Sequence, residues 1–267
     1  MALETVREGT LEYLRARSIS ASHGFTTRFG GVSKGYLDSL NIGIHRGDDW
    51  ENVLKNYEIL GKALNFDIHK LVLSHQTHTD IVRRVGRAEA GAGLFAPQLE
   101  ECDALITNEP GVALVIFTAD CTPILLHDPV TGAVGAAHAG WRGTASGIAG
   151  KTVAAMQREF GCEPENIRAA IGPNIGFCCF QTDEDVPRGM REAFGSAAEP
   201  FIRPQEHKYY VNLKGINRLV LEQAGVRKVE VSTDCTVCQS HRFWSHRVTH
   251  GMRGSQGAII VCKEGTK

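Results

Sequence analysis

Residues 111–144 read GVALVIFTADCTPILLHDPVTGAVGAAHAGWRGT and predict three strands in succession. The first, over residues 111–118, is a continuous apolar and β-rich run, which is typical of a strand covered on both faces. Residues 123–127 and 133–138 then flank DPVTG, whose turn-forming residues favour an antiparallel hairpin. The rest of the predicted fold extends from this hairpin.

Helices and strands alternate on both sides of the hairpin. Asp48 and Asp49 can cap a helix over residues 51–64, whose apolar residues recur at helical spacing. A second helix is expected over residues 145–160, with Thr144 as its cap, and two more over residues 184–194 and 215–223. The other expected strands cover residues 70–74, 81–85, 168–171, 209–212, 228–232 and 258–261. Interleaved elements together with a hairpin favour an α+β fold of mixed β-sheets flanked by helices. No linker or repeat divides the chain, so residues 1–267 are expected to form one domain.

The composition is that of an ordinary globular protein of 267 residues, with 42% apolar and 22% charged residues. Its 29 Lys and Arg residues against 30 Asp and Glu residues give a net charge of −1, which supplies no overall field for binding nucleic acid or an anionic membrane. The N-terminal MALETVREGTLEYLRARS lacks the core of a signal peptide, and the longest apolar run is far shorter than the ~20 residues of a membrane span. We therefore expect a cytoplasmic protein in which recognition depends on a local site.

Eight cysteines indicate either a disulfide framework or free thiols and metal ligands. Free thiols fit better, because the chain is large and lacks a secretory signal. Cys235-x-x-Cys238 has no second CxxC at zinc-ribbon spacing and no thioredoxin-like surroundings, which favours structural or incidental thiols. The neighbouring pair Cys178-Cys179 receives no role from the sequence.

Two potential metal ligands lie at the ends of the hairpin. If its turn is centred near residues 129–130, Cys121 and His138 face each other within a residue, with Cβ atoms ~5 Å apart. His78, in the polar turn HQTH just before a predicted strand, is the available third ligand. Two His and one Cys leave an open position on a tetrahedral zinc, where the pKa of bound water could fall to about 7. His75 would compete as a ligand only if this segment were helical.

Other interpretations of the same residues stay open. Cys121 could be a buried core thiol, because free cysteine packs well. Without a metal, Cys121 and His138 could form a thiolate–imidazole dyad that attacks an acyl carbon, with Asp120 orienting the histidine. Spacing alone does not separate these interpretations.

Two glycine-rich segments each contain a fixed cation. TTRFGGVS and GWRGT place Arg28 and Arg142 among glycines, a composition suited to binding a phosphate or a carboxylate. Arg142 also precedes a predicted helix N-terminus, which attracts anions. Signatures of a P-loop, a zinc protease and a nucleobase deaminase are missing from the sequence.

Taken together, the distinctive segments resemble those of a known family. They are TTRFGGVS at 26–33, SLNIG at 39–43, HxGDD at 45–49, HQTH at 75–78 with DIV at 80–82, TADCxP at 118–123, AHAGWRG at 137–143, IGPxIG at 171–176 followed by Cys178-Cys179, DCT at 234–236 and FxSxR at 243–247. In this order they are similar to the YfiH family, also called the multicopper polyphenol oxidase or laccase-domain family. Where that family usually has Ser-Tyr-Arg, this chain has Ser245-His246-Arg247.

The resemblance implies a mixed α/β sandwich, shared with a deamidating bacterial toxin, and zinc ligands at His78, Cys121 and His138. It also implies purine nucleoside chemistry: phosphorolysis of adenosine, inosine and S-methyl-5'-thioadenosine to the base and (methylthio)ribose 1-phosphate, and deamination of adenosine. Copper-dependent polyphenol oxidation has also been ascribed to the family. Cu2+ is disfavoured here, because no His-x-His pair occurs to build a copper cluster.

The sequence thus predicts a zinc-dependent purine nucleoside enzyme. Asp120 would move a proton during attack of zinc-held hydroxide on the purine, and Arg28 or Arg142 would hold phosphate beneath the anomeric carbon. Asn41 and Arg247, which lie in matching motifs, are predicted to bind substrate. The alternative is a Cys–His amidohydrolase that acts on a peptide or amino-acyl bond, as in peptidoglycan-precursor editing. A binding module without catalysis fits an open zinc position least.

Overall fold

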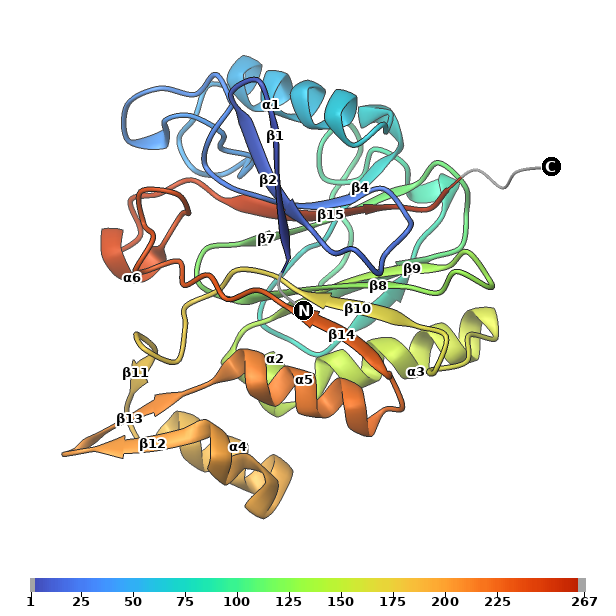
Figure 1. Cartoon of the computed structure of the whole chain (residues 1–267). Coiled ribbons are helices and arrows are strands. Elements are labelled where there is room, and N and C mark those ends of the chain that lie inside the picture. Colours follow the sequence, from blue (N-terminus) through green and yellow to red (C-terminus); the bar gives the residue numbers. More distant parts are fainter. Residues whose placement is uncertain (1–2, 264–267) are drawn as a thin grey trace.

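The computed structural model describes residues 3–263, which form stacked layers of helices and sheets (Figure 1). Helix α1, Trp50–Ala63, covers one face of a six-stranded first sheet, and a six-stranded second sheet packs against the other face. The outer face of the second sheet is covered by α2 (Trp141–Ala145), α3 (Ile148–Phe160) and α5 (Leu213–Gln223). A three-stranded third sheet and α4, Asp185–Phe194, lie at one end. These layers confirm the predicted α+β fold of mixed sheets flanked by helices.

Each sheet combines segments from distant parts of the chain. The first sheet has the order β1-β2-β3-β15-β7-β4, with the bounds Glu4–Glu8, Leu11–Arg15, His23–Thr26, Gln256–Val261, Ala113–Thr118 and Leu71–Leu73. The second has the order β14-β10-β8-β9-β6-β5, with the bounds Lys228–Val231, Arg168–Ile171, Thr122–His127, Val134–Ala139, Ala104–Thr107 and Val82–Arg84. The third has the order β11-β13-β12, with the bounds Gln181–Thr182, Lys208–Val211 and Ile202–Gln205. The short helix α6 covers His246–Thr249, and 3-10 turns cover Gly35–Leu37, Ile68–Lys70, Arg87–Glu89 and Gly195–Phe201.

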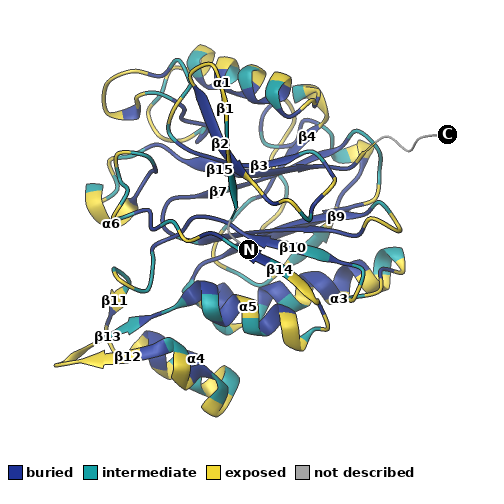
Figure 2. Cartoon of the chain, viewed as in Figure 1, coloured by how far each residue is buried: buried dark blue, intermediate teal, exposed yellow. Residues whose placement is uncertain are grey.

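Three apolar layers hold these elements together (Figure 2). Val53, Tyr57 and Leu60 of α1 are fully buried against the first sheet, as their helical spacing predicts. Ile116 of β7 and Leu125 of β8 are fully buried in the layer between the two sheets. Strand β7 therefore contacts apolar layers on both faces, which explains its uninterrupted apolar sequence.

The hairpin forms, but its pairing is shifted by two residues from the expected one. Strands β8 and β9 are antiparallel, and Pro123, not Cys121, faces His138. The cause is the loop, in which Asp128 N donates to Ala133 O at 2.9 Å, so its centre lies beyond residues 129–130. The prediction that Cys121 and His138 face each other within a residue is thus wrong, and the two residues are diagonal neighbours.

The helix expected over residues 145–160 is broken into α2 and α3. Gly147 lies between them with a φ of +72°, a left-handed conformation that glycine adopts without steric cost. Thr144 is not a cap: it lies inside α2, is buried, and accepts a hydrogen bond from Asn217 Nδ2 at 2.9 Å. Strands β1–β3, β6, β11 and β12 were not expected from the sequence. Within residues 3–263, every helix is too short or too polar to cross a membrane.

Candidate metal centre and adjoining cavity

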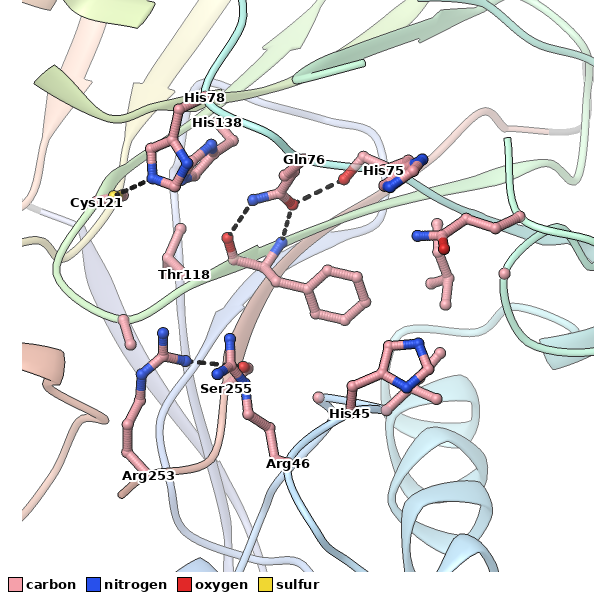
Figure 3. Close-up of a pocket in the computed structure, with 18 residues that line it drawn as sticks. His45, Arg46, His75, Gln76, His78, Thr118, Cys121, His138, Arg253 and Ser255 are labelled. Atoms are coloured by element: carbon pink, nitrogen blue, oxygen red, sulfur yellow. Dashed lines mark hydrogen bonds between the residues drawn. The ribbon is translucent and has the colours of Figure 1, made fainter. Parts of the chain in front are cut away.

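The structure brings together the three candidate metal ligands that the sequence indicated, His78, Cys121 and His138, hereafter the trio (Figure 3). Each offers one donor atom, and these atoms all lie within 4.8 Å of one another. Cys121 Sγ is 3.8 Å from His78 Nε2, and the two imidazole rings meet edge to face. Two nitrogen donors and one thiolate are a ligand set for zinc that leaves a fourth position open.

The trio lies where the chain crosses from the first sheet to the second. His78 belongs to the segment between β4 and β5, and Cys121 belongs to the short connection between β7 and β8. His138, the third residue of the trio, lies near the end of β9. His78 and Asp120, the residue before Cys121, have φ values of +66° and +85°. Such backbone is rare outside glycine and persists where the surroundings hold it in place.

Asp103, a residue to which the sequence assigned no role, holds the His78 segment and His138 in place. Its fully buried carboxylate accepts hydrogen bonds from the backbone N–H groups of Thr77, His78 and Thr79 at 2.8–3.2 Å. It also contacts His138 Nδ1 at 2.7 Å, which leaves Nε2 as the histidine's metal-binding atom. The one sequence signal for Asp103 is its place in CDALIT, residues 102–107, where an acidic residue directly precedes an apolar run.

The charges of these groups stabilise the ionised carboxylate and thiolate. Burial tends to raise the pKa of Asp103, but the hydrogen bond and charge of His138 outweigh it and lower the pKa to about 2. Burial also tends to raise the pKa of Cys121, but the charge of His138 and the contact with His78 lower it to about 6. Burial tends to lower the pKa of His138, but Cys121 and Asp103 raise it to about 9. The lowered pKa of Cys121 favours its thiolate, which is the form in which cysteine binds metals.

Replacing Asp103 with asparagine is expected to weaken zinc binding by the trio about tenfold, because second partners of metal ligands have effects of this size. An amide accepts hydrogen bonds only through its oxygen, so its NH2 group would face N–H donors of the His78 segment. Zinc affinity is measured by competition with a chromogenic chelator. Asp80→Asn is the control, since Asp80 is partly exposed and pairs with Lys151 instead. An unchanged affinity in Asp103→Asn would contradict the positioning role.

Gly140 provides the space in which two of the ligands meet. A Cβ atom at this position would lie 2.8 Å from His78 Cδ2 and 3.4 Å from Cys121 Sγ. Any side chain here would therefore displace the imidazole of His78. This close approach is a physical reason for glycine in the segment AHAGWRG.

A cavity of about 390 Å³ opens beside the trio. Its volume lies within the range of small-molecule sites. Besides the trio, its polar lining consists of His45, Arg46, Ser74, His75, Gln76, Gln98, Thr118, Arg253 and Ser255. Gln76 is held against β7, where it donates to Phe117 O at 2.8 Å and accepts from Phe117 N at 2.6 Å.

Two arginines supply the positive charge of this cavity. Figure 3 shows the guanidinium groups of Arg46 and Arg253 beside one another, on the side of the cavity opposite the trio. Burial, and then the charge of Arg46, lower the pKa of Arg253 to about 10. Arg253 Nη1 donates to Gly254 O and Ser255 Oγ at 3.0 and 3.1 Å, whereas its buried Nε has no partner within residues 3–263. Two guanidinium groups on one wall of a cavity are an arrangement that favours an anionic ligand.

Asp120 does not contact His138. Its carboxylate accepts hydrogen bonds from Thr236 Oγ1 at 2.5 Å, Ser245 Oγ at 3.1 Å and Arg247 N at 2.7 Å. The prediction that Asp120 orients His138 is therefore wrong, because Asp103 makes that contact. Asp120 instead ties the segment before Cys121 to the C-terminal part of the chain.

The other predicted substrate residues have partners within the protein. The guanidinium of Arg28 donates to Asp38 O at 2.7 and 3.0 Å and lies 4.0 Å above the ring of Trp244. Asn41 is fully buried and bonds to Asp48 and Gly43. Arg247 donates to Cys179 O and Gln181 O, and Arg142 lies over the ring of Trp141. Among the described residues that line the cavity, none is Arg28, Asn41, Asp120, Arg142 or Arg247.

The two cavity arginines were not singled out from the sequence. Arg46 is the variable position of the motif HxGDD, and Arg253 lies just before β15. The fold brings them together from positions more than 200 residues apart. Their place beside the trio is therefore visible only in three dimensions.

Comparison with known proteins relates this site to enzymes. The family model described as "Multi-copper polyphenol oxidoreductase laccase" matches residues 22–263. The purine nucleoside phosphorylase YlmD of Geobacillus stearothermophilus is 40% identical over 246 residues, which cover 90% of each chain. A crystal structure of YlmD from the same organism superposes with a TM-score of 0.91 and 38% identity over 97% of this chain and 99% of that one. The adenosine deaminase RL5, from an unknown prokaryotic organism, is 33% identical over 238 residues, which cover 87% of this chain and 90% of RL5. The chain therefore belongs to the multi-copper polyphenol oxidoreductase laccase family.

Proposed function

We propose that this enzyme is a zinc-dependent purine nucleoside phosphorylase that also deaminates adenosine. Its substrates would be inorganic phosphate and adenosine, inosine or S-methyl-5'-thioadenosine. The observation that carries the proposal is the trio and the arginine pair Arg46 and Arg253 lining one cavity. Relatives named as a purine nucleoside phosphorylase and as an adenosine deaminase support both activities. The free cysteines support a reducing, cytoplasmic location.

The residues of the trio fit a zinc ion. Their donor atoms lie within 4.8 Å of one another, and Asp103 fixes the ring orientation of His138. A zinc ion held there would act as a Lewis acid and would lower the pKa of a coordinated water. Copper oxidation finds less support, because the second metal-ligand group within residues 3–263 consists of four cysteines and adds no histidine.

Phosphorolysis requires that a phosphate oxygen attacks the anomeric carbon while the bond from that carbon to the purine nitrogen breaks. The leaving base accepts a proton, and the sugar leaves as its 1-phosphate. Arg46 and Arg253 line the cavity and would hold the phosphate dianion through their guanidinium charges. Holding both reactants in one cavity supplies the proximity that the reaction needs.

The direct test incubates zinc-loaded protein with adenosine, with and without phosphate. Adenine and ribose 1-phosphate should form only with phosphate, whereas inosine should form in both cases. Chromatography of the products separates the two reactions. If zinc-loaded protein forms none of these products, the proposal fails.

A second candidate, an amidohydrolase, is favoured by one specific observation. Asp103 contacts His138, and His138 neighbours Cys121, so the three side chains form the order of a Cys–His–Asp catalytic triad. The protein as purified distinguishes the candidates. Near-stoichiometric zinc that protects Cys121 from iodoacetamide supports the phosphorylase, whereas metal-free protein with rapidly alkylated Cys121 supports the amidohydrolase.

A further inference from the structure

A second group of metal-ligating side chains lies away from the trio. The Sγ atoms of Cys178, Cys179, Cys235 and Cys238, hereafter the four-cysteine cluster, all lie within 4.8 Å of one another. Cys238 Sγ is 3.6 Å from Cys178 Sγ and 3.4 Å from Cys179 Sγ. The purine nucleoside chemistry proposed above uses none of these thiols.

The topology of the second sheet brings the four cysteines together. Strands β10 and β14 are parallel neighbours, so the loops that follow them leave the sheet at the same edge. The first loop carries Cys178 and Cys179, and the second carries Cys235 and Cys238. A bridge between Asn174 and Cys235 joins the two loops.

Backbone groups prepare the cluster for thiolates. Gly176 N donates to Cys235 Sγ at 3.2 Å, and such N–H bonds stabilise a thiolate that binds a metal. A Cβ atom on Gly176 would lie 3.0–3.2 Å from Cys235 Cβ, Cys178 Sγ and Cys235 Sγ, so glycine permits the approach of the two loops. Each loop also closes a tight turn, with Cys179 N donating to Gly176 O and Gln239 N donating to Cys235 O.

The spacing of the sulfur atoms matches one ion rather than a disulfide or a multinuclear cluster. Zinc–sulfur bonds of about 2.3 Å in a tetrahedron place the sulfur atoms about 3.8 Å apart. The observed separations of 3.4 and 3.6 Å approach that value. A disulfide needs about 2.05 Å between sulfur atoms. An iron–sulfur cluster would need room for several atoms between the four thiols.

We propose that the four-cysteine cluster binds a structural Zn2+ ion. Four thiolates close the coordination shell, so this ion offers no open position for a substrate. Binding replaces the four S–H bonds by zinc–sulfur bonds and releases the protons to solvent.

The ion would support the first site through one hydrogen bond. Thr236, which lies between the second pair of cysteines, donates to Asp120 Oδ1 at 2.5 Å. Asp120 directly precedes Cys121 of the trio. The closed zinc site would thus fix the loop that holds the backbone of a ligand at the open site.

The test counts zinc per chain by mass spectrometry in protein purified under reducing conditions. Wild-type protein should contain two zinc ions, and Cys238→Ser and Cys121→Ser should each contain one. Cys162→Ala is the matched control, since Cys162 is buried outside both groups, and it should retain two. A single ion in wild-type protein that is lost in Cys121→Ser overturns the proposal, as do two ions in Cys238→Ser.

Cobalt substitution gives a readout that does not depend on the folding of Cys238→Ser. In Cys121→Ser, Co2+ should bind at the four-cysteine cluster and produce the intense charge-transfer absorption of a tetrathiolate site. A spectrum without thiolate charge transfer overturns the proposal, and so does a gain of four titratable thiols in denatured protein after reduction. Nucleoside turnover is measured separately, so failure of the proposed function leaves this test intact.

Discussion

Cys121→Ser is expected to lower kcat/KM for adenosine phosphorolysis at least about 10³-fold and to remove the zinc ion of the trio. Zinc supplies several kcal/mol of transition-state stabilisation, and each 1.36 kcal/mol is a factor of ten in rate. Serine keeps the shape of the side chain but lacks the thiolate charge that its neighbours stabilise in Cys121. Deamination of adenosine should fall in parallel, because the proposed function uses the same ion for both reactions.

The measurements are steady-state kinetics and zinc content of the same preparation. Cys162→Ala serves as the control, since it removes a buried thiol from the apolar layer beside α3 and should leave zinc at the trio unchanged. Cys121→Ser with full phosphorolysis and no zinc at the trio would show that the metal has no part in the reaction.

Arg253→Met is expected to lower phosphorolysis about 100-fold at low phosphate while adenosine deamination stays nearly unchanged. Loss of a charge-assisted bond to phosphate costs about 1.5–3 kcal/mol, and deamination uses water in place of phosphate. Methionine retains an apolar stem, so the packing of this half-buried residue is largely preserved. The effect should appear as a raised KM for phosphate with little change in the KM for adenosine.

Arg142→Met is the matched control for the anion site. Arg142 is exposed and lies over Trp141, outside the set of residues that line the cavity. Its glycine-rich sequence predicted a phosphate ligand, whereas the proposed function gives this role to Arg46 and Arg253, which line the cavity. A larger loss of phosphorolysis in Arg142→Met than in Arg253→Met would reverse that assignment.

Local sequence patterns were sufficient for the elements that carry strong periodicity. Helix α1 and the hairpin β8–β9 were predicted because spacing and turn residues are local signals. Cys121 and His138 come together despite the error in register, because diagonal neighbours on adjacent strands remain within reach of one ion. The strand β2 was not predicted, because its charged residue Glu12 is buried by pairing with Arg242, 230 positions away.

The parts of the site that could not be predicted depend on contacts between distant segments. Asp103 accepts hydrogen bonds from a loop and a strand that no local pattern connects to it. Arg28 looked available for phosphate, yet the carbonyl groups of Asp38 and Ser240 already occupy its guanidinium. Gly31, three residues after Arg28, is needed for close packing of the backbone, since a Cβ atom there would lie 2.3 Å from Ser39 O.

The trio and the two arginines of the cavity are supplied by different segments of the chain, so substitutions near the arginines need not affect the trio. The trio depends on the crossing segments and β9, whereas Arg46 lies in the loop before α1 and Arg253 in the loop before β15. A library randomised at Ile44, His45 and Met252 would diversify those loops without altering a metal ligand. Changes in these loops would therefore alter the surroundings of the cavity and leave the trio unchanged.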